Sequence, residues 1–203
     1  MKREVNHEMD KLETEDIWFS FLNRLTPTGV ETESEHFRDT PQRVSKMWKE
    51  LLRGQGLSAE SFSSILFPYF ETKNNEMIIV QDIGSFGVCP HHLLPIEYIS
   101  HVGYIPEHKA IGLSKIPRLV KTMSARLIIQ EDLSMEICNV IQETLKPKGV
   151  MVVMRGIHGC TKFRGIRDEN SLMSTSAITG VFRDPEEKAR EEFLNIVSLN
   201  RSR

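Results

Sequence analysis

Residues 77–83, MIIVQDI, and residues 98–105, YISHVGYI, decide the fold class of this chain. Both stretches are short, and β-branched and aromatic residues supply most of their apolar side chains, which is typical of β-strands. The segment between them contains Gly87 and the run Cys-Pro-His-His, so the chain is expected to turn there. We therefore predict two strands that pair as a hairpin.

A pair of helices is predicted after these strands. Apolar residues recur at positions 116, 119, 120 and 123, and again at 133, 137, 140, 141 and 145, with the spacing of a helix face. Residues 146–149, KPKG, end the pair. Residues 150–155 and 157–164 return to strand character, and we expect a turn or bulge near His158 and Gly159.

Further helices are expected on both sides of this region. Residues 10–25 carry an amphipathic pattern, and a second helix begins near Pro41 and stops at Gly54. Residues 54–75 are expected to form a long connection, and a final helix is expected over residues 185–199. Grouped strands on either side of a helix pair favour an α+β fold with a four-stranded antiparallel sheet.

The length of 203 residues suits one sizeable domain with an appendage. We expect a disordered tail over residues 1–15, an N-terminal helical region over residues 16–75 and a catalytic domain over residues 76–203.

Composition excludes several classes of function. Lys and Arg number 26 against 28 Asp and Glu, a net charge of −2, so no basic excess indicates a nucleic-acid surface. No apolar run approaches the roughly 20 residues of a membrane span, and residues 1–20 lack the apolar segment of a secretory signal. Because three cysteines cannot form a complete disulfide framework, we expect a cytoplasmic protein in a reducing compartment.

The Cys-x-x-His spacing of Cys89 and His92 lets both side chains reach one metal ion from a tight turn. A third ligand must come from elsewhere, and Cys160 suits this better than Cys138, which lies within an apolar helix pattern. Three protein ligands would leave one position for water, as in a catalytic zinc site. The alternative, a pair of packed histidines near an unrelated thiol, stays open on spacing alone.

The segment His158-Gly159-Cys160-Thr161-Lys162-Phe163-Arg164 is the most informative for chemistry. If it is a strand, alternate side chains share a face. One face then carries His158, Cys160, Lys162 and Arg164, and the other is mostly apolar. An imidazole and a thiol among two cations is an unusual set for a solvated strand face.

A helix entrance over residues 112–118 indicates anion binding. Ser114 is expected to cap it, and Lys115 and Arg118 lie on its first turn, where the helix dipole disfavours cations unless an anion binds. Together with Lys162, Arg164 and Arg43 these cations suit a polyphosphate.

Several motifs, in order along the chain, resemble the GTP cyclohydrolase I family. They are Cys89-x-His91-His92, Gly112-Leu113-Ser114-Lys115-x-x-Arg118, Arg126-Leu127-x-x-Gln130-Glu131-x-Leu133, and His158-x-Cys160 with Arg164-Gly165-Ile166-Arg167. Asp39-Thr40-Pro41-x-Arg43 and Gly180-Val181-Phe182 also resemble that family. The resemblance covers residues 15–199. Pro90 is a departure, because many relatives carry Glu at that position.

The resemblance implies a role for each matched position. One zinc ion per subunit would be held by Cys89, His92 and Cys160. Catalytic positions would be His91, His158 and Ser114, the last near the ribose. The substrate would be bound by Glu131 and Gln130 at the guanine and by Lys115, Arg118, Arg164 and Arg43 at the triphosphate.

The family resemblance also implies a reaction and an assembly. GTP would be hydrolysed and rearranged to 7,8-dihydroneopterin triphosphate with release of formate, at the start of folate, biopterin or 7-deazaguanine synthesis. The tunnelling fold would join the sheets of several chains into a barrel, in a homodecamer of two stacked pentamers with active sites shared between subunits. Two alternatives stay open: another tunnelling-fold enzyme acting on a pterin or deazapurine, and a nucleotide-binding protein with structural zinc and Cys138 as fourth ligand.

Overall fold

The computed structural model describes residues 13–25 and 34–199. The chain forms two compact units, Met1–Leu51 and Leu52–Arg203. The residues between positions 52 and 75 therefore group with the second unit, whereas the sequence assigned them to an N-terminal helical region. None of the helices in the described part of the chain combines the length and apolar character that a membrane span requires.

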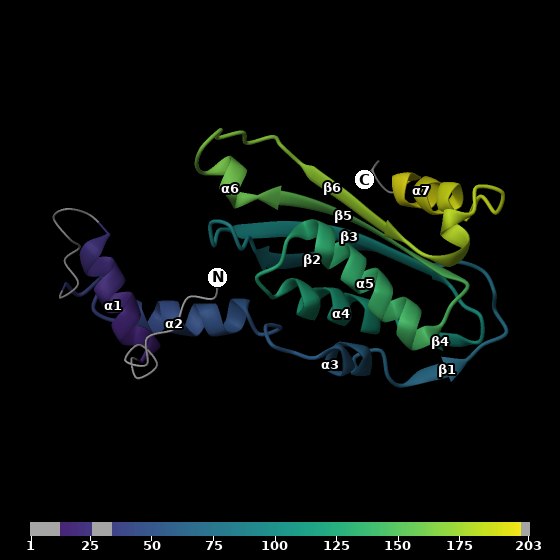
Figure 1. Cartoon of the computed structure of the whole chain (residues 1–203), viewed down its shortest axis with the longest axis horizontal. Coiled ribbons are helices and arrows are strands. Elements are labelled where there is room, and N and C mark those ends of the chain that lie inside the picture. The colour runs from purple at the N-terminus through teal and green to yellow at the C-terminus, as the bar shows by residue number, and fades with distance from the viewer. Residues whose placement is uncertain (1–12, 26–33, 200–203) are drawn as a thin grey trace, which may run out of the picture. The chain divides into compact units, whose positions relative to one another are not determined.

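The first unit contains helices α1 (Thr14–Arg24) and α2 (Thr40–Leu51) (Figure 1). Their contact includes the rings of Trp18 and Trp48, which stack with centroids 6.2 Å apart and planes 3° apart. Both helices lie where the sequence predicts them. Residues 10–12 of the first predicted helix, and most of the predicted tail, lie outside the described residues.

The second unit is built on one four-stranded antiparallel sheet in the order β2-β3-β5-β6 (Figure 1). Its strands are β2 (Ile78–Val88), β3 (Pro95–Ile105), β5 (Gly149–His158) and β6 (Met173–Ile178). Helices α4 (Lys115–Ser124) and α5 (Gln130–Leu145) connect the two strand pairs and cover one face of the sheet. The predicted α+β class, with a helix pair between two antiparallel strand pairs, is confirmed.

The core lies between the sheet and these two helices because β3 alternates. Ile96, Val102 and Tyr104 are buried beneath the helices, where they meet the apolar stripes of α4 and α5. On the other face, the C-terminal helix α7 (Ala189–Leu199) covers one end of the sheet. Phe193 lies so close to Gly103 that a side chain there would meet its ring at 2.7 Å.

The prediction of a strand over residues 157–164 is wrong. Strand β5 runs unbroken to His158, and Gly159–Lys162 forms one helical turn, α6, instead of a strand. Local bonds account for this, since the Phe163 N–H donates to the Gly159 carbonyl and the Thr161 hydroxyl donates to the His158 carbonyl. The fourth strand is the later segment β6, so the predicted alternation of faces from His158 to Arg164 does not apply.

Three smaller differences concern connections and helix starts. The expected long connection contains helix α3 (Ala59–Ser64), capped by Ser58, and strand β1 (Tyr69–Glu71), which pairs with β4 (Lys109–Ile111). Helix α7 begins at Ala189, because the Glu186 N–H instead donates to the Asp184 side chain in a turn before it.

Candidate active site

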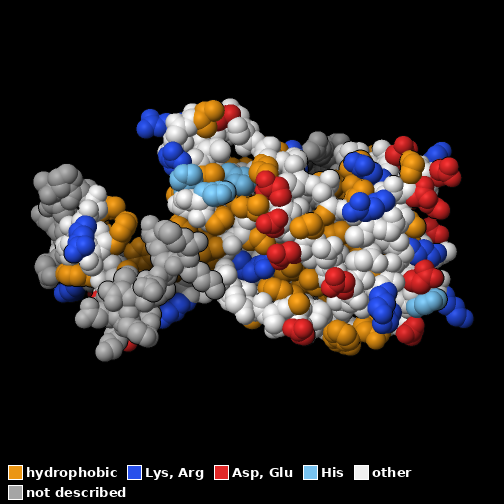
Figure 2. Space-filling model, in the orientation of Figure 1, with side chains coloured by type: hydrophobic (Ala, Val, Ile, Leu, Met, Phe, Trp, Pro, Cys, Tyr) orange, Lys and Arg blue, Asp and Glu red, His pale blue; other side chains and the backbone are white. Residues whose placement is uncertain are grey.

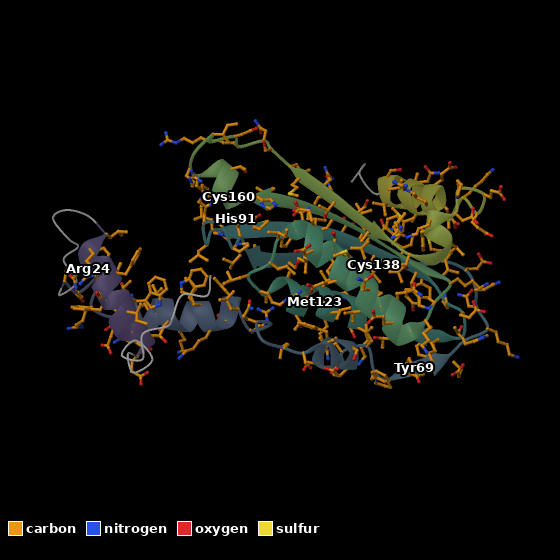
Figure 3. All side chains as sticks on the ribbon, viewed as in Figure 1. Arg24, Tyr69, His91, Met123, Cys138 and Cys160 are labelled. Atoms are coloured by element: carbon orange, nitrogen blue, oxygen red, sulfur yellow. The ribbon has the colours of Figure 1, made fainter. Side chains whose placement is uncertain are left out.

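Three chain segments meet at one end of the sheet, which we name the site end. It is formed by the end of β2 at Val88, the start of β3 at Pro95 and the end of β5 at His158, because Val88 pairs with Pro95 and Ile96 pairs with His158. A tight turn over residues 89–94 is closed by two backbone bonds between Cys89 and residues 93 and 94. The side chains of the site come from this turn, from the end of β5 and from helix α6, which follows β5 directly (Figure 3).

Cys89, His92 and Cys160 form one group at the site end, which we name the candidate metal-binding group, with a potential ligand atom from each lying within 4.8 Å of the other two. A tetrahedral zinc ion places thiolate and imidazole ligand atoms about 3.5–3.8 Å apart, so a small closure would fit this set around an ion. Two sulfurs and one ring nitrogen are donors that zinc prefers. Within residues 13–25 and 34–199, no fourth ligand of this kind joins the three.

The surroundings of these ligands are polar on one side. Figure 2 shows histidine side chains gathered at the surface of this end, with Lys or Arg side chains beside them. His91 Nδ1 lies 3.6 Å from the Cys89 sulfur, and Arg164 donates to His92 Nε2 at 2.5 Å. Burial raises the pKa of the Cys160 thiol, and neighbouring Cys89 raises it further. The Cys160 thiol therefore retains its proton more strongly than an isolated cysteine until a cation compensates the charge of its thiolate.

Gln130 fixes the orientation of His158. Its side chain is fully buried, and its amide nitrogen donates to the carbonyls of Met154 and Met173 and to the Thr175 hydroxyl, at 3.1–3.2 Å. These three acceptors identify the amide nitrogen, so the remaining amide oxygen faces His158 Nε2 at 2.9 Å and must accept from it. The neutral His158 ring therefore carries its proton on Nε2 and leaves Nδ1 free to accept one.

This network also bears on the guanine contact that the family resemblance implies for Gln130. The side-chain NH2 group donates to protein acceptors, and the amide oxygen accepts from His158 with one of its two lone pairs. Gly156 makes this possible, since a side chain there would collide with the Gln130 amide oxygen. Gln130 holds β5, β6 and His158 together.

Glu131 follows Gln130 in the first turn of α5 and is exposed. Its charge acts on His158, because burial lowers the pKa of that imidazole and Glu131 raises it in part. The carboxylate therefore lies within electrostatic range of the site end and is free to accept hydrogen bonds from a ligand.

The residues of α4 that were expected to bind phosphate lie away from the site end of the sheet in the folded chain. The Ile111 N–H donates to the Tyr104 hydroxyl at 3.3 Å, and Tyr104 lies eight residues along β3 from Ile96, about 26 Å at 3.3 Å per residue. Lys115 follows this segment and donates to the Phe67 carbonyl. The first turn of α4 is thus at the opposite end of the sheet, which we name the packed end and which is formed by residues 78, 104, 105, 149 and 150.

The expected cap of α4 differs from the structure, and the phosphate role expected for Arg43 stays a prediction. Ser114 precedes α4, but its side chain makes no capping bond. Arg43 belongs to the other compact unit and pairs with Asp39 at 3.4 Å. Neither observation assigns these residues to the site within a single chain.

Cys138 is separate from the candidate metal-binding group (Figure 3). Its sulfur lies 3.7 Å from the Val150 carbonyl at the packed end, and burial raises the pKa of its thiol to about 11. It cannot serve as the fourth ligand that a closed structural zinc site would need.

Tyr98 belongs to the site end, although the sequence gave it only a place in a strand. Its ring packs edge-on against His158, with centroids 6.5 Å apart and planes at 86°. The alternation of β3 places Tyr98 on the helix-covered face, but no sequence signal predicts that its ring leans toward the site end.

A cavity of about 430 Å³ lined by Phe86, Ile99 and Ile157 opens on the other face of the sheet and contains no member of the candidate metal-binding group.

Comparison with known proteins gives consistent matches. A family model described as GTP cyclohydrolase I matches residues 20–198. The chain is 40% identical over 195 residues to GTP cyclohydrolase 1 of Sulfurihydrogenibium sp. (strain YO3AOP1), with 95% of this chain and 98% of the relative covered. It is 43% identical over 174 residues to GTP cyclohydrolase 1 of Parabacteroides distasonis, covering 85% and 87% of the two chains. For GTP cyclohydrolase 1 of Porphyromonas gingivalis (strain W83) the identity is 41% over 177 residues, covering 87% and 90%.

Proposed function

Because the chain belongs to the GTP cyclohydrolase I family, we propose that it converts GTP and water to 7,8-dihydroneopterin triphosphate and formate. The observation that carries the proposal is the convergence of Cys89, His92 and Cys160 beside an imidazole whose orientation is fixed by Gln130. Thiols and imidazoles brought together from two distant segments, residues 89–92 and 158–160, form an open donor set, as a catalytic metal site requires.

We assign Cys89, His92 and Cys160 as the ligands of one zinc ion per subunit. A zinc ion bound there would supply a hydroxide near neutral pH by lowering the pKa of a bound water. Binding would also compensate the charge of the two adjacent thiolates. Arg164, which contacts His92, would then be free to turn toward a phosphate group.

Proton transfer at the purine is assigned to His158 and His91. The Gln130 contact leaves His158 Nδ1 as the accepting nitrogen, and partial burial favours the neutral ring that a base needs. His91 is exposed and lies next to the Cys89 sulfur, so it can exchange protons with solvent as well as with the site.

Glu131 is assigned to the guanine. A carboxylate presents two acceptors to the adjacent N1–H and 2-amino donors of that base. Among the described acidic side chains, Glu131 is the one whose charge raises the pKa of His158. Gln130 contributes by positioning His158 instead of contacting the base with its side chain.

The triphosphate-binding residues imply an assembly. Arg164 lies at the site end of its own chain, whereas Lys115 and Arg118 lie near the packed end, with Ser114 before them. We propose that these α4 residues complete the site of a neighbouring subunit in a homodecamer of two stacked pentamers, and that Arg43 joins the same phosphate site. Strands β2 and β6 each have one edge without a partner strand among the described residues, which is the condition for joining sheets into a barrel.

The test is incubation of the purified protein with GTP, with formate and pterin fluorescence followed together. Zinc-loaded protein is expected to release one formate for each pterin formed, and a chelator should stop both. A GTP analogue that lacks phosphates should turn over poorly, because the cationic groups would then have no partner. Failure to form either product with zinc bound, between about pH 6 and pH 9 where imidazole and zinc-bound water titrate, would refute the assignment.

A further inference from the structure

Tyr98 places a buried phenol at the site end, and its hydroxyl has no hydrogen-bond partner among the described residues. The side chain is only 2% exposed. An unpaired buried hydroxyl costs about 1–3 kcal/mol, so such a group in a native protein needs an explanation. Neither the packing of the core nor the assignments above give this hydroxyl a role.

The ring of Tyr98 leans toward the candidate metal-binding group. Along the ladder Tyr98 pairs with Ser85 and Gly156, yet the ring lies beside the next residues toward the site end. A side chain at Gly87 would meet Tyr98 Cε2 at 2.8 Å and its hydroxyl at 3.5 Å, and the ring packs against His158. Gly87 and His158 each precede one of the two metal-binding cysteines by two residues. The phenol is therefore directed between the strand ends that carry Cys89 and Cys160.

The Tyr98 hydroxyl keeps its proton, so it can donate a hydrogen bond to a nearby anion. Burial raises the pKa of Tyr98, and the charges of Cys89 and Glu131 raise it further. The phenol thus keeps its proton at physiological pH, and the Cys89 sulfur lies within electrostatic range of it.

We propose that Tyr98 donates a hydrogen bond from its hydroxyl to the sulfur of Cys89 when that residue holds the metal as a thiolate. Tyr98 is then a positioning residue that stabilises one ligand from outside the coordination sphere. The inference rests on the proposed function, because it takes Cys89 as a metal ligand.

Cys89 is favoured over the other acceptors by its burial. Its side chain is buried like the hydroxyl, whereas Glu131 is exposed and faces the solvent side of α5. His158 Nε2 donates to Gln130 and is no acceptor, and the accepting Nδ1 is the atom that the proposed function assigns to proton transfer at the purine. A buried thiolate also needs donors, since an ionised sulfur without them is costly to keep away from water.

The test compares Tyr98→Phe with Ser100→Ala. Ser100 lies two residues along the same strand, and its hydroxyl is also buried without a partner, so its removal controls for deletion of an unpaired group. Tyr98→Phe keeps the ring and its packing against His158. Zinc affinity is measured by chelator competition, and the cobalt-loaded proteins are compared by their sulfur-to-cobalt charge-transfer absorption.

Tyr98→Phe is expected to weaken zinc binding about tenfold and to move the charge-transfer band to longer wavelength, because the thiolate loses a donor. Ser100→Ala should change neither quantity. In the unaltered protein, zinc addition should produce a tyrosine difference spectrum that Tyr98→Phe abolishes, which tests the contact without relying on the affinity of a variant.

Unchanged affinity and spectra in Tyr98→Phe would overturn the proposal. A higher KM for GTP with unchanged metal binding would also overturn it, by assigning the hydroxyl to the purine. Absence of zinc binding by the unaltered protein is a different result, since it would refute the proposed function itself.

Discussion

The two ends of the same sheet differ in how completely their polar groups are paired. At the packed end, Thr179 exchanges hydrogen bonds with Val150 and Gln142, and the ring of Phe193 covers the sheet at Gly103. At the site end, the Tyr98 hydroxyl is unpaired among the described residues, and two thiols face each other. The polar groups of the packed end are thus paired within the protein, whereas the site end has polar groups that a ligand can bind.

The cysteines make this difference concrete. Cys138 faces the packed end, contacts a backbone carbonyl and is fully buried, so it behaves as a small apolar side chain. Cys89 and Cys160 lie at the edge of the main core, in a turn and a one-turn helix that bring their sulfurs together with His92. The same residue type therefore packs the core in one place and, in the proposed function, would hold a metal ion in the other, according to which end of the sheet its segment reaches.

The largest expected effect separates these two kinds of cysteine. Cys160→Ser removes one of two sulfur ligands, so metal content is expected to fall from about one ion per chain to near zero and activity with it. Cys138→Ser, the matched control, should retain the metal. Metal analysis of both purified variants decides, and a fully loaded, active Cys160→Ser protein would contradict the ligand assignment.

The packed end is expected to respond in stability instead of chemistry. Phe193→Ala removes a completely buried ring and should lower the free energy of unfolding by about 3–5 kcal/mol. Leu199→Ala, an exposed position on the same helix, should change it by less than about 0.5 kcal/mol. Denaturant unfolding measures both. Loss of zinc affinity in folded Phe193→Ala would show that the two ends are not independent.

The central part of the fold could be predicted from the sequence because its elements are strongly periodic. The α4–α5 pair and the β2–β3 strands follow from apolar spacing and β-branched composition. Strand β6 could not be found in this way, since three of the six residues in its sequence MSTSAI are polar and none of the six is fully buried. The alternation of residues 158–164 imitated a strand, but local bonds after Gly159 form a helical turn.

The site was predictable in its ligands and not in its geometry. The Cys-x-x-His spacing of Cys89 and His92 is local, so the sequence contains it directly. The partners of Gln130 lie on β5 and β6, far along the chain, and only strand register brings them together. For the same reason spacing could not place Lys115, to which the family resemblance gives a triphosphate role, and the fold puts it near the packed end of its own chain.

A smaller effect tests the thiol of the packed end. Because burial raises the pKa of Cys138 to about 11 from an ordinary value of 9.0, its thiolate fraction at pH 8 should be about 100-fold lower than that of an unperturbed cysteine. The rate of alkylation at Cys138 in the native protein should rise about tenfold per pH unit between pH 8 and pH 10, as the thiol ionises. Peptide mass spectrometry gives the rate at each site. A plateau near pH 9 would mean that Cys138 is not held in this environment.

The smallest predicted effect concerns Glu131 at the site end. Glu131→Ala should raise the KM for GTP and lower kcat/KM about tenfold, because the guanine donors would lose a paired acceptor. Asp132→Ala is the matched control, since Asp132 also lies in the acidic first turn of α5 and its removal affects the helix dipole equally.

Inosine 5′-triphosphate sharpens the comparison, because it lacks the 2-amino group and so loses one of the two donors that the carboxylate would bind. The unaltered protein should prefer GTP over this analogue, and Glu131→Ala should narrow that preference while Asp132→Ala keeps it. The Glu131 carboxylate would then have the guanine as its hydrogen-bond partner, just as the neighbouring Gln130 amide has protein groups as its partners. If Glu131→Ala kept the full preference for GTP, the acceptor for the base would have to be sought on another element, and the exposed carboxylate would serve only the helix.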